Sequence, residues 1–394
     1  MTQYYFHEKI VLALCLLILN NYLFLNFNFP ILLIKINFLI FLLILLIFYF
    51  KNFSENLFLK IFFMILIFIS LGTPTFEWDP RSIWLFHAKR IFYENSIFAV
   101  ADNYAEFSHN GYPKIASAFA SSFAVLIGHW NEVFPKLSFL FMFLPPLILT
   151  YIFFKETQYL IFLSIVFFTV GKFLFNGWSD GLIAVYFCLS AFLMYLLMIS
   201  DNDYFKKKFI YYLIAFCFFI ILTLIKNEGS VLLLILFTTV FLTKFFKKEF
   251  GKDIYRLIFL SFSFLPIIFW KLFCYLNGIG YSEYYNLDIL SNLLPRLYEL
   301  NNYQLISYFL LLNEKFLVCL IFFLISFWLN WDKKVFNYVS ISALIYIFVL
   351  SFVFLSTPYD LFWQLDSSAA RIVRSLSFLL AFFGLYNLRN KISD

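Results

Sequence analysis

Residues 31–50 have the sequence ILLIKINFLIFLLILLIFYF, in which Lys35 is the only charged side chain. Twenty such residues in a helix rise about 30 Å, which matches the thickness of the hydrocarbon core of a bilayer. Similar stretches recur along the chain and are separated by short polar segments. The sequence therefore predicts an all-α protein, a polytopic transmembrane helical bundle that forms a single transmembrane domain over residues 1–394.

The composition excludes a water-soluble globular protein. Of the 394 residues, 63% are hydrophobic and 13% are charged, whereas soluble domains have roughly 45–50% apolar and about 25% charged residues. The net charge is +6, but the lysine clusters lie at the ends of apolar stretches and form no basic stripe, so we expect no nucleic-acid partner. The cysteines are dispersed without a Cys-x-x-Cys pair, which predicts buried free thiols: Cys15, Cys188, Cys217, Cys274 and Cys319.

Thirteen apolar segments are candidate spans, near residues 10–26, 31–50, 57–73, 114–130, 134–154, 158–175, 180–199, 209–225, 229–246, 255–275, 315–331, 335–355 and 369–388. Short loops rich in Lys and Arg favour the cytoplasm. Such clusters are Lys206 to Lys208, then Lys244, Lys247, Lys248, Lys252 and Arg256, then Lys333 with Lys334, and Arg389 with Lys391. These anchors predict that the loops outside the cytoplasm are 74–112, 176–180, 226–228, 276–314 and 356–368.

Alternation of sides allows two crossings between residues 112 and 176, where three candidate segments lie. We expect the least apolar of them, 114–130, to be only half inserted. About twelve crossings result, with both chain ends in the cytoplasm. We predict a multi-pass protein of the cell (inner) membrane whose functional site faces away from the cytoplasm.

The loop 74–112 carries eight charged side chains and two histidines. Asp79 followed by Pro80 is typical of a helix start, because Asp can cap free amides and Pro needs no amide hydrogen at the first position. The stretch 80–95 predicts an amphipathic helix at the membrane surface. Its apolar arc would contain Ile83, Trp84, Ala88, Ile91 and Phe92, and its polar arc Ser82, Lys89, Arg90 and Tyr93.

Glu77 and Asp79 are the candidate catalytic residues in this outer catalytic loop. Beside the basic side chains of Arg81, Lys89 and Arg90, one of the two carboxylates could act as a general base while the cations hold a lipid-linked phosphate. Two simpler interpretations stay open. Asp79 could cap the helix without any catalytic role, and the cations could extend towards anionic headgroups without binding a substrate.

Ser108 to Lys114 form the end of the same loop, with the sequence SHNGYPK. Lys114 at the outer surface opposes the usual charge bias, which favours a phosphate ligand at this position. His109 could bind a metal or transfer a proton, although a single histidine in a loop more often does neither.

Two further outer turns carry candidates. Asp180 heads a helix after Asn176, and it could either line the site or cap the helix. Lys226 and Glu228 interrupt a long apolar stretch, where ionisable groups are costly unless they line a polar cavity. The alternative for this pair is a plain hairpin turn.

Arg371 and Arg374 share one face in the first turns of the last helix. Cations at this position oppose both the helix dipole and the positive-inside tendency, so a nearby anion would explain them. The alternative is an internal ion pair with Asp360 or Asp366.

Together these features resemble the GT-C class of integral membrane glycosyltransferases, especially bacterial members. The resemblance rests on the acidic pair Glu77 and Asp79 ahead of an amphipathic stretch, and on three later stretches: Tyr112-Pro113, Lys226 to Gly229, and Thr357 to Arg371. It covers about a quarter of the chain. This sequence departs from the class in having additional helices before the acidic loop and no large soluble C-terminal domain, which suggests a minimal, transmembrane-only member.

The resemblance implies an inverting transfer of a hexose or pentose from a polyprenyl-phosphate sugar donor to a saccharide, lipid or protein acceptor outside the cytoplasm, in contact with membrane lipid. Asp79, or else Glu77, would deprotonate the acceptor hydroxyl. The phosphate would be held by residues drawn from Arg81, Lys89, Lys114, Lys226 and Arg371. Other substrate contacts are expected from His109, Tyr112, Asp180, Glu228, Asp360 and Arg374. Some members use a divalent cation, so Mg or Mn bound by Asp79, Glu77 or Asp180 is an open expectation.

A multi-pass lipid or polysaccharide transporter or flippase is the main alternative. It predicts charges in the middle of spans and two similar halves, neither of which is visible here. An O-antigen polymerase-like enzyme would place its main arginines in one large later loop, but the segment 276–314 contains few arginines.

Overall fold

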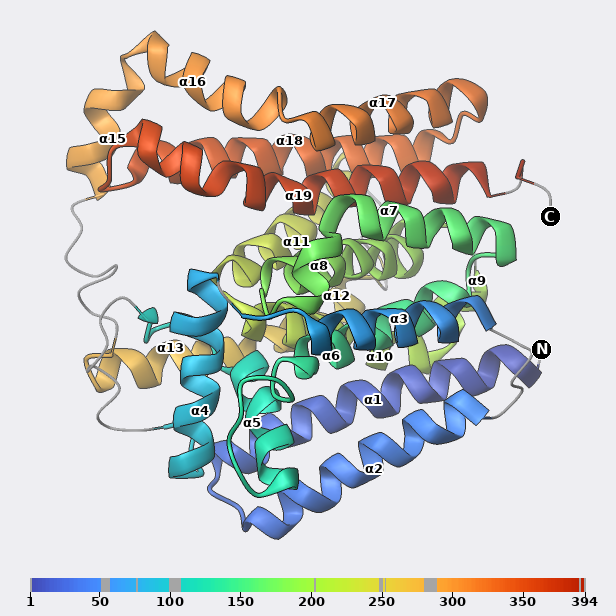
Figure 1. Cartoon of the computed structure of the whole chain (residues 1–394). Coiled ribbons are helices and arrows are strands. Elements are labelled where there is room, and N and C mark those ends of the chain that lie inside the picture. Colours follow the sequence, from blue (N-terminus) through green and yellow to red (C-terminus); the bar gives the residue numbers. More distant parts are fainter. Residues whose placement is uncertain are drawn as a thin grey trace.

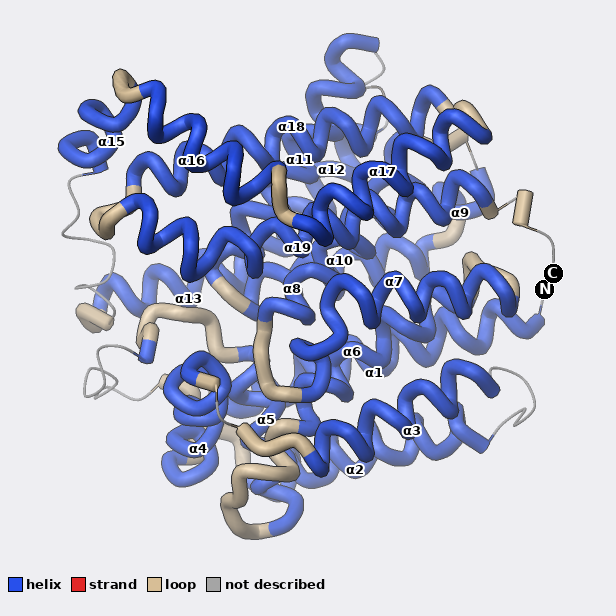
Figure 2. The backbone as a smooth tube through the Cα atoms, turned by 45° about the horizontal axis from the view of Figure 1, so that its top comes forward, coloured by secondary structure: helices blue, strands red, loops and turns tan. Residues whose placement is uncertain are grey.

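The computed structural model describes residues 2–50, 57–75, 77–98, 108–201, 203–247, 251, 253–279, 289–389 and 391–392. The predicted cytoplasmic anchors Lys248 and Lys252 lie outside these ranges, as do parts of the loops 74–112 and 276–314. The described residues contain helices and no strand (Figure 2). The prediction of an all-α chain is therefore confirmed for them.

The helices of the first half are α1 (Thr2–Asn26), α2 (Ile31–Phe50), α3 (Leu57–Gly72), the π-helix η1 (Pro80–Trp84), α4 (Leu85–Glu94), α5 (Ile115–Ile127), α6 (Leu137–Tyr151), α7 (Glu156–Phe175), α8 (Asp180–Met194) and the π-helix η3 (Tyr195–Ile199). Those of the second half are α9 (Asp203–Lys207), α10 (Phe209–Ile225), α11 (Asn227–Lys247), α12 (Asp253–Ser261), the short 3₁₀ turn η4 (Phe262–Phe264), α13 (Leu265–Leu276), α15 (Ile289–Leu297), α16 (Leu300–Leu311), α17 (Glu314–Leu329), α18 (Lys333–Ser356) and α19 (Leu361–Leu388).

Eight helical stretches within the described residues are long and apolar enough to cross a membrane, and α16 with α17, bent by 70°, would make a ninth. All thirteen predicted apolar segments fall on helices. These helices indicate a multi-pass membrane protein. The expected number of about twelve crossings is not confirmed, because α3, α5, α6 and α10 are shorter than the other spans. The 13 residues of α5 rise only about 20 Å, less than the hydrocarbon core.

The centre of the bundle is α8, whose residues are all buried. It packs against α19, α10, α7, α11 and α6. Its sequence explains this position, because Asp180 at its first residue is its only charged side chain. The start of α1 and the end of α19 lie at the same end of the bundle (Figure 1). Two ion pairs lie at this end, Lys208 with Glu8 and Lys334 with Asp201.

Residues 80–94 of the loop 74–112 form η1 followed by α4, which runs across the direction of α1 and α3 (Figure 1). The location of this helix at the outer membrane surface stays a prediction. Ile83, Trp84 and Ile91 are buried, as its amphipathic pattern predicts. The assignment of Arg90 to the polar arc is wrong. This guanidinium is buried, and it bonds the Glu94 carboxylate at 2.6 Å, because the chain turns back after α4 and covers it.

The predicted outer loop 276–314 is not a simple loop, since α15 and α16 occupy its second part. Arg296 at the end of α15 donates hydrogen bonds to the carbonyl oxygens of Thr357 at 2.6 Å and Tyr359 at 2.8 Å. This contact ties α15 to the turn that precedes α19. All five cysteines are buried and free, as predicted.

Candidate functional site

Asp79 and Arg371, separated by 292 residues in sequence, form an ion pair. An Arg371 guanidinium nitrogen lies 2.7 Å from Asp79 Oδ2, and the Asp79 and Arg371 side chains are 16% and 26% exposed. Pro80 stands at the first position of η1, as expected, but Asp79 makes no capping hydrogen bond through its side chain. The capping interpretation of Asp79 is therefore wrong in this structure, because its carboxylate faces Arg371.

The turn between α7 and α8 completes the surroundings of this pair. The Arg371 guanidinium carbon lies 4.9 Å from the centre of the Trp178 ring, a cation–π distance. Gly177 has φ +87°, and a Cβ placed there would lie 3.3 Å from Cβ of Pro80. A glycine here gives the turn its left-handed backbone and lets it approach the start of η1 closely.

A second ionic group lies beside the first. Lys226 Nζ is 3.5 Å from Asp180 Oδ1 and 3.0 Å from Glu228 Oε1. Burial alone would lower the pKa of Lys226, but Asp180 and Glu228 raise it above its ordinary value, so this lysine is protonated at neutral pH. Asp180 is thus a partner of Lys226, and Ser179 rather than Asp180 is the N-cap residue of α8.

The tight hairpin of α10 and α11 sets the position of Lys226. The amide of Gly229 donates to the Lys226 carbonyl oxygen at 2.9 Å. A Cβ on Gly229 would lie 1.9 Å from the Leu222 carbonyl oxygen. Only glycine allows the two helices to approach this closely, which explains the Lys-Asn-Glu-Gly sequence of the turn.

The two ionic groups act on each other. Asp180 and Glu228 both attract the Arg371 guanidinium, and Arg371 repels Lys226. Asp180 Oδ2 and Glu228 Oε2 are buried and have no hydrogen-bond partner among the described residues. Because buried carboxylate oxygens are normally hydrogen-bonded, these two atoms are suited to accept hydrogen bonds from a bound ligand.

Tyr112 and His109 lie next to Lys226. Lys226 Nζ is 5.8 Å from the centre of the Tyr112 ring. The His109 ring stacks on Tyr112 with 4.6 Å between ring centres, and His109 has the uncommon φ of 50°. These two predicted residues thus form one wall beside the ionic groups.

Lys114 is not brought to Asp79 and Arg371. Its side chain is buried, and its Nζ lies 5.9 Å from the centre of the Trp270 ring. It also faces His87, whose Nε2 lies 2.8 Å from the Ser108 carbonyl oxygen and so donates to it. Burial lowers the pKa of His87, and Lys114 lowers it further, so the imidazole is neutral at neutral pH.

Several other predicted residues lie apart from the ionic groups. Arg81 and Lys89 are exposed, and no ion pair of either is found among the described side chains. Asp360 is the N-cap of α19 and accepts from the Trp363 amide at 2.9 Å. Glu77 is exposed and lies 3.9 Å from Lys172. Arg371 does not pair with Asp360 or Asp366, so this alternative is wrong for the described structure.

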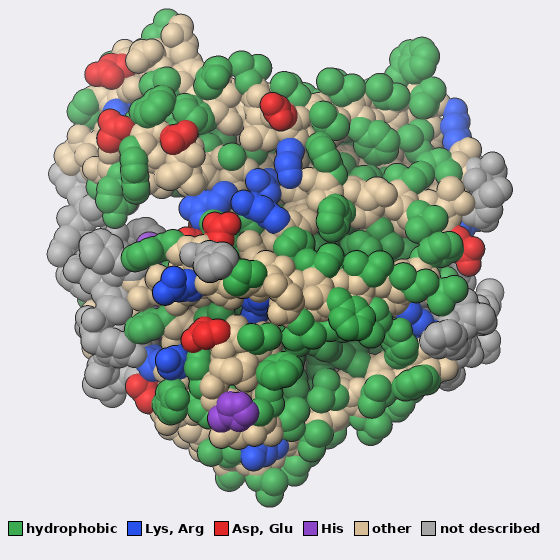
Figure 3. All heavy atoms as spheres, viewed as in Figure 1, with side chains coloured by type: hydrophobic (Ala, Val, Ile, Leu, Met, Phe, Trp, Pro, Cys, Tyr) green, Lys and Arg blue, Asp and Glu red, His purple; other side chains and the backbone are tan. Residues whose placement is uncertain are grey.

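Arg374 lies over the Phe173 ring, with 4.3 Å between the guanidinium carbon and the ring centre. Lys172, Lys315 and Trp178 adjoin the same region, and the sequence alone predicts none of them as a site residue. Lys172 and Lys315 each lie near the end of an apolar segment, where lysine is ordinary. A basic residue at a predicted outer end is the only signal that could have found them. Figure 3 shows Lys and Arg side chains gathered near the middle of one face, beside acidic side chains.

The donor set does not fit a divalent cation. Glu77 is exposed and near Lys172, Asp79 bonds Arg371, and Asp180 bonds Lys226. Within the part of the chain that the structure describes, no group of three or more His, Cys, Asp or Glu side chains is placed to hold a metal ion. The carboxylates of this site therefore face cationic side chains and are not arranged as metal ligands.

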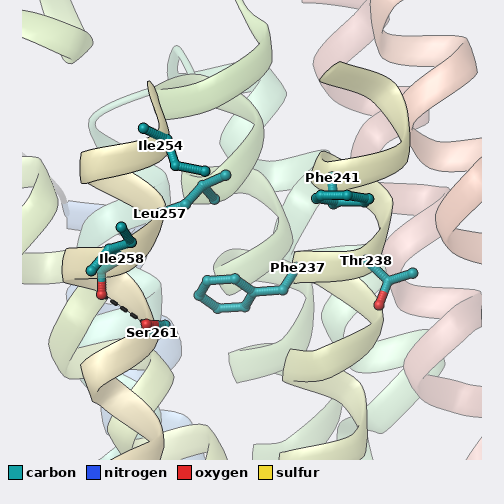
Figure 4. A pocket seen from close by; sticks show the side chains of 7 residues that line it. All are labelled: Phe237, Thr238, Phe241, Ile254, Leu257, Ile258 and Ser261. Atoms are coloured by element: carbon teal, nitrogen blue, oxygen red, sulfur yellow. Dashed lines mark hydrogen bonds between the residues drawn. The ribbon is translucent and has the colours of Figure 1, made fainter. Parts of the chain in front are cut away.

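A cavity of about 340 Å³ lies elsewhere, between α11 and α12 (Figure 4). Its lining is almost entirely apolar and contains none of the candidate residues: Phe237, Thr238, Phe241, Ile254, Leu257, Ile258 and Ser261. An apolar hollow of this kind on a membrane helix pair suits acyl chains better than polar chemistry.

The chain matches no protein-family model, no curated protein and no solved structure.

Proposed function

We propose that this protein is a membrane glycosyltransferase that moves a sugar from a polyprenyl-phosphate carrier to an acceptor hydroxyl on the non-cytoplasmic side. The observation that carries the proposal is the ion pair of Asp79 and Arg371, next to the group formed by Lys226, Asp180 and Glu228. Ionised groups are costly near a bilayer and are seldom kept without a function. A general base and cations at one site are what transfer from a lipid phosphate requires.

Asp79 serves as the general base. Arg371 engages Oδ2, and no hydrogen bond among the described residues engages Oδ1. The acceptor hydroxyl would donate to Oδ1 and transfer its proton there as its oxygen attacks the anomeric carbon. The bond between this carbon and the phosphate oxygen breaks at the same time, so the configuration inverts.

Negative charge develops on the departing lipid phosphate. Arg371 bonds the proposed base, and Lys226 bonds Asp180, which also attracts Arg371; both cations would stabilise that charge in the transition state. The free oxygens of Asp180 and Glu228 would accept hydrogen bonds from hydroxyl groups of the sugar and orient it.

The assignment of this site to the outside rests on the lysine clusters of the predicted cytoplasmic loops. The acceptor is expected to approach from the side of η1 and α4.

The experiment that tests the proposal is a transfer assay with the purified protein and radiolabelled polyprenyl-phosphate sugars. Asp79→Asn should lower kcat roughly 10²–10⁴-fold, because the amide cannot take the proton. Asp366→Asn, which removes an exposed carboxylate of α19, is the matched control and should turn over as wild type. Normal turnover of Asp79→Asn would contradict the proposal. If the wild-type protein instead translocates lipid in vesicles without any transfer activity, and Asp79→Asn abolishes this translocation, the transporter is favoured.

A further inference from the structure

Three cations from three helices converge on one turn of α7. Lys315 Nζ of α17 donates to the Phe168 carbonyl oxygen at 2.7 Å. Arg374 of α19 donates to the Thr169 carbonyl oxygen at 3.5 Å, and its guanidinium lies over Phe173. Lys172 Nζ of α7 itself lies 5.3 Å from the centre of the same Phe173 ring.

These cations are close enough to repel one another. Arg374 and Lys172 both act on Lys315 electrostatically, and both effects oppose its charge. Like charges that face each other in a partly buried place raise the free energy unless an anion compensates them.

Nearby carboxylates compensate these three positive charges only weakly. Among the described side chains, no ion pair joins Lys315 or Arg374 to an acid. Lys172 has Glu77 at 3.9 Å, and these side chains are 56% and 45% exposed, so water weakens the contact. Asp180 attracts Arg374 from a distance, but Arg371 opposes this attraction. Asp79 and Lys226, in contrast, already have their partners.

The surroundings of this basic cluster, Lys172, Lys315 and Arg374, are apolar and open. Phe167 and Phe168 on the same turn of α7 are 52% and 44% exposed. Exposed phenylalanines on a membrane helix contact acyl chains. A ligand at this place would therefore meet cations and lipid-facing aromatic rings together.

We propose that Lys172, Lys315 and Arg374 form a binding site for a phosphate group carried on a lipid, which enters laterally from the bilayer over α7. The site takes a phosphomonoester or diphosphate, because three cations match more than one negative charge. This binding does not depend on the proposed glycosyl transfer. If that transfer occurs, the cluster is the place from which the lipid phosphate reaches Arg371.

The test measures equilibrium binding of radiolabelled farnesyl phosphate, without any sugar, to the full chain in phosphatidylcholine nanodiscs. Farnesyl phosphate should bind, farnesol should not, and binding should weaken at high salt. Lys315→Gln and Arg374→Gln should each raise Kd by about tenfold, the loss of one charge-assisted hydrogen bond. Lys315→Arg should retain most of the affinity. Lys333→Gln, an exposed lysine at the other end of the bundle, is the matched control.

Competition identifies the source of the phosphate. Displacement by phosphatidic acid, a membrane lipid with a phosphomonoester headgroup, as readily as by unlabelled farnesyl phosphate would identify a lipid headgroup as the ligand. Displacement by farnesyl phosphate or farnesyl diphosphate alone would identify a prenyl carrier, and either result supports the site.

If a buried variant does not fold, the Kd is measured with the exposed variant Lys172→Gln instead. Unchanged Kd in all folded variants of the cluster would overturn the proposal whether or not the protein transfers sugars.

Discussion

At the scale of residues, the ionised side chains of the candidate site divide into two kinds. Asp79, Asp180 and Glu228 have basic partners at 2.7 to 3.5 Å. Lys315 and Arg374 have backbone carbonyls and aromatic rings instead. Removal of one member of a partly buried pair leaves an uncompensated charge, so substitutions at the first kind should affect both stability and function.

His87 should make the protein sensitive to acid. Burial and then Lys114 lower the pKa of His87, with smaller contributions from Arg90 and His109. In the unfolded chain its pKa returns to about 6.5. Below that pH the unfolded state binds a proton that the folded state does not bind, so the free energy of unfolding falls, by up to about 1.4 kcal/mol per pH unit.

His87→Gln would keep a donor for the Ser108 carbonyl oxygen but would not titrate. Its Tm in detergent should therefore decline less than that of wild type between about pH 7 and pH 5. His129→Gln changes an exposed histidine and should decline as wild type does. Equal slopes for His87→Gln and wild type would show that His87 does not cause the acid sensitivity.

At the scale of elements, the hairpin of α10 and α11 is the part that a single methyl group should disturb most. In Gly229→Ala the new Cβ would lie 1.9 Å from the Leu222 carbonyl oxygen, so the two helices must separate. Overpacking of this kind costs about 1–3 kcal/mol, and it would move Lys226 away from Asp180.

The matched control is Gly72→Ala in α3, where a Cβ would meet nothing within 4 Å. Gly229→Ala should lower both Tm and any transfer activity, whereas Gly72→Ala should leave both close to wild type. A Gly229→Ala protein with the Tm of wild type would contradict the close helix approach.

Helices are predictable from this sequence and their packing partners are not. Each apolar run is long enough to specify a helix by itself, so all thirteen segments fall on helices. The segment that holds α15 and α16 lacks such a run, so its pattern resembles that of a loop. Arg90 looks exposed in the sequence because the periodicity of one helix says nothing about the chain that later covers it.

The residues of the candidate site are likewise only partly predictable from the sequence. Outer loops and unusual arginines point to Asp79 and Arg371 from the sequence alone, because charge is rare in this chain. Lys172 and Lys315 are not predictable in this way, since a lysine at the end of a span is ordinary and only packing of α7, α17 and α19 brings these side chains together.

At the scale of the whole molecule, the described helices form a bundle with ionic groups at both ends. One end holds the start of α1, the end of α19 and the pair of Lys208 with Glu8 (Figure 1). The other holds the turns after α7 and α10, with Asp79 and Arg371. The single domain, the inner membrane and the outward-facing site stay predictions.

Asp79 and Arg371 should meet on the side of the membrane away from the cytoplasm, and the proposed transfer depends on this location. The direct measurement is the labelling of intact cells with a membrane-impermeant thiol reagent, using the exposed neighbours Trp78→Cys and Ala370→Cys, with Lys333→Cys as the cytoplasmic control. All native cysteines are buried, so the background should be low. We predict labelling of the first two variants from outside, and of Lys333→Cys only after the cells are opened. Labelling of Trp78→Cys and Ala370→Cys from opposite sides of the membrane would contradict this arrangement.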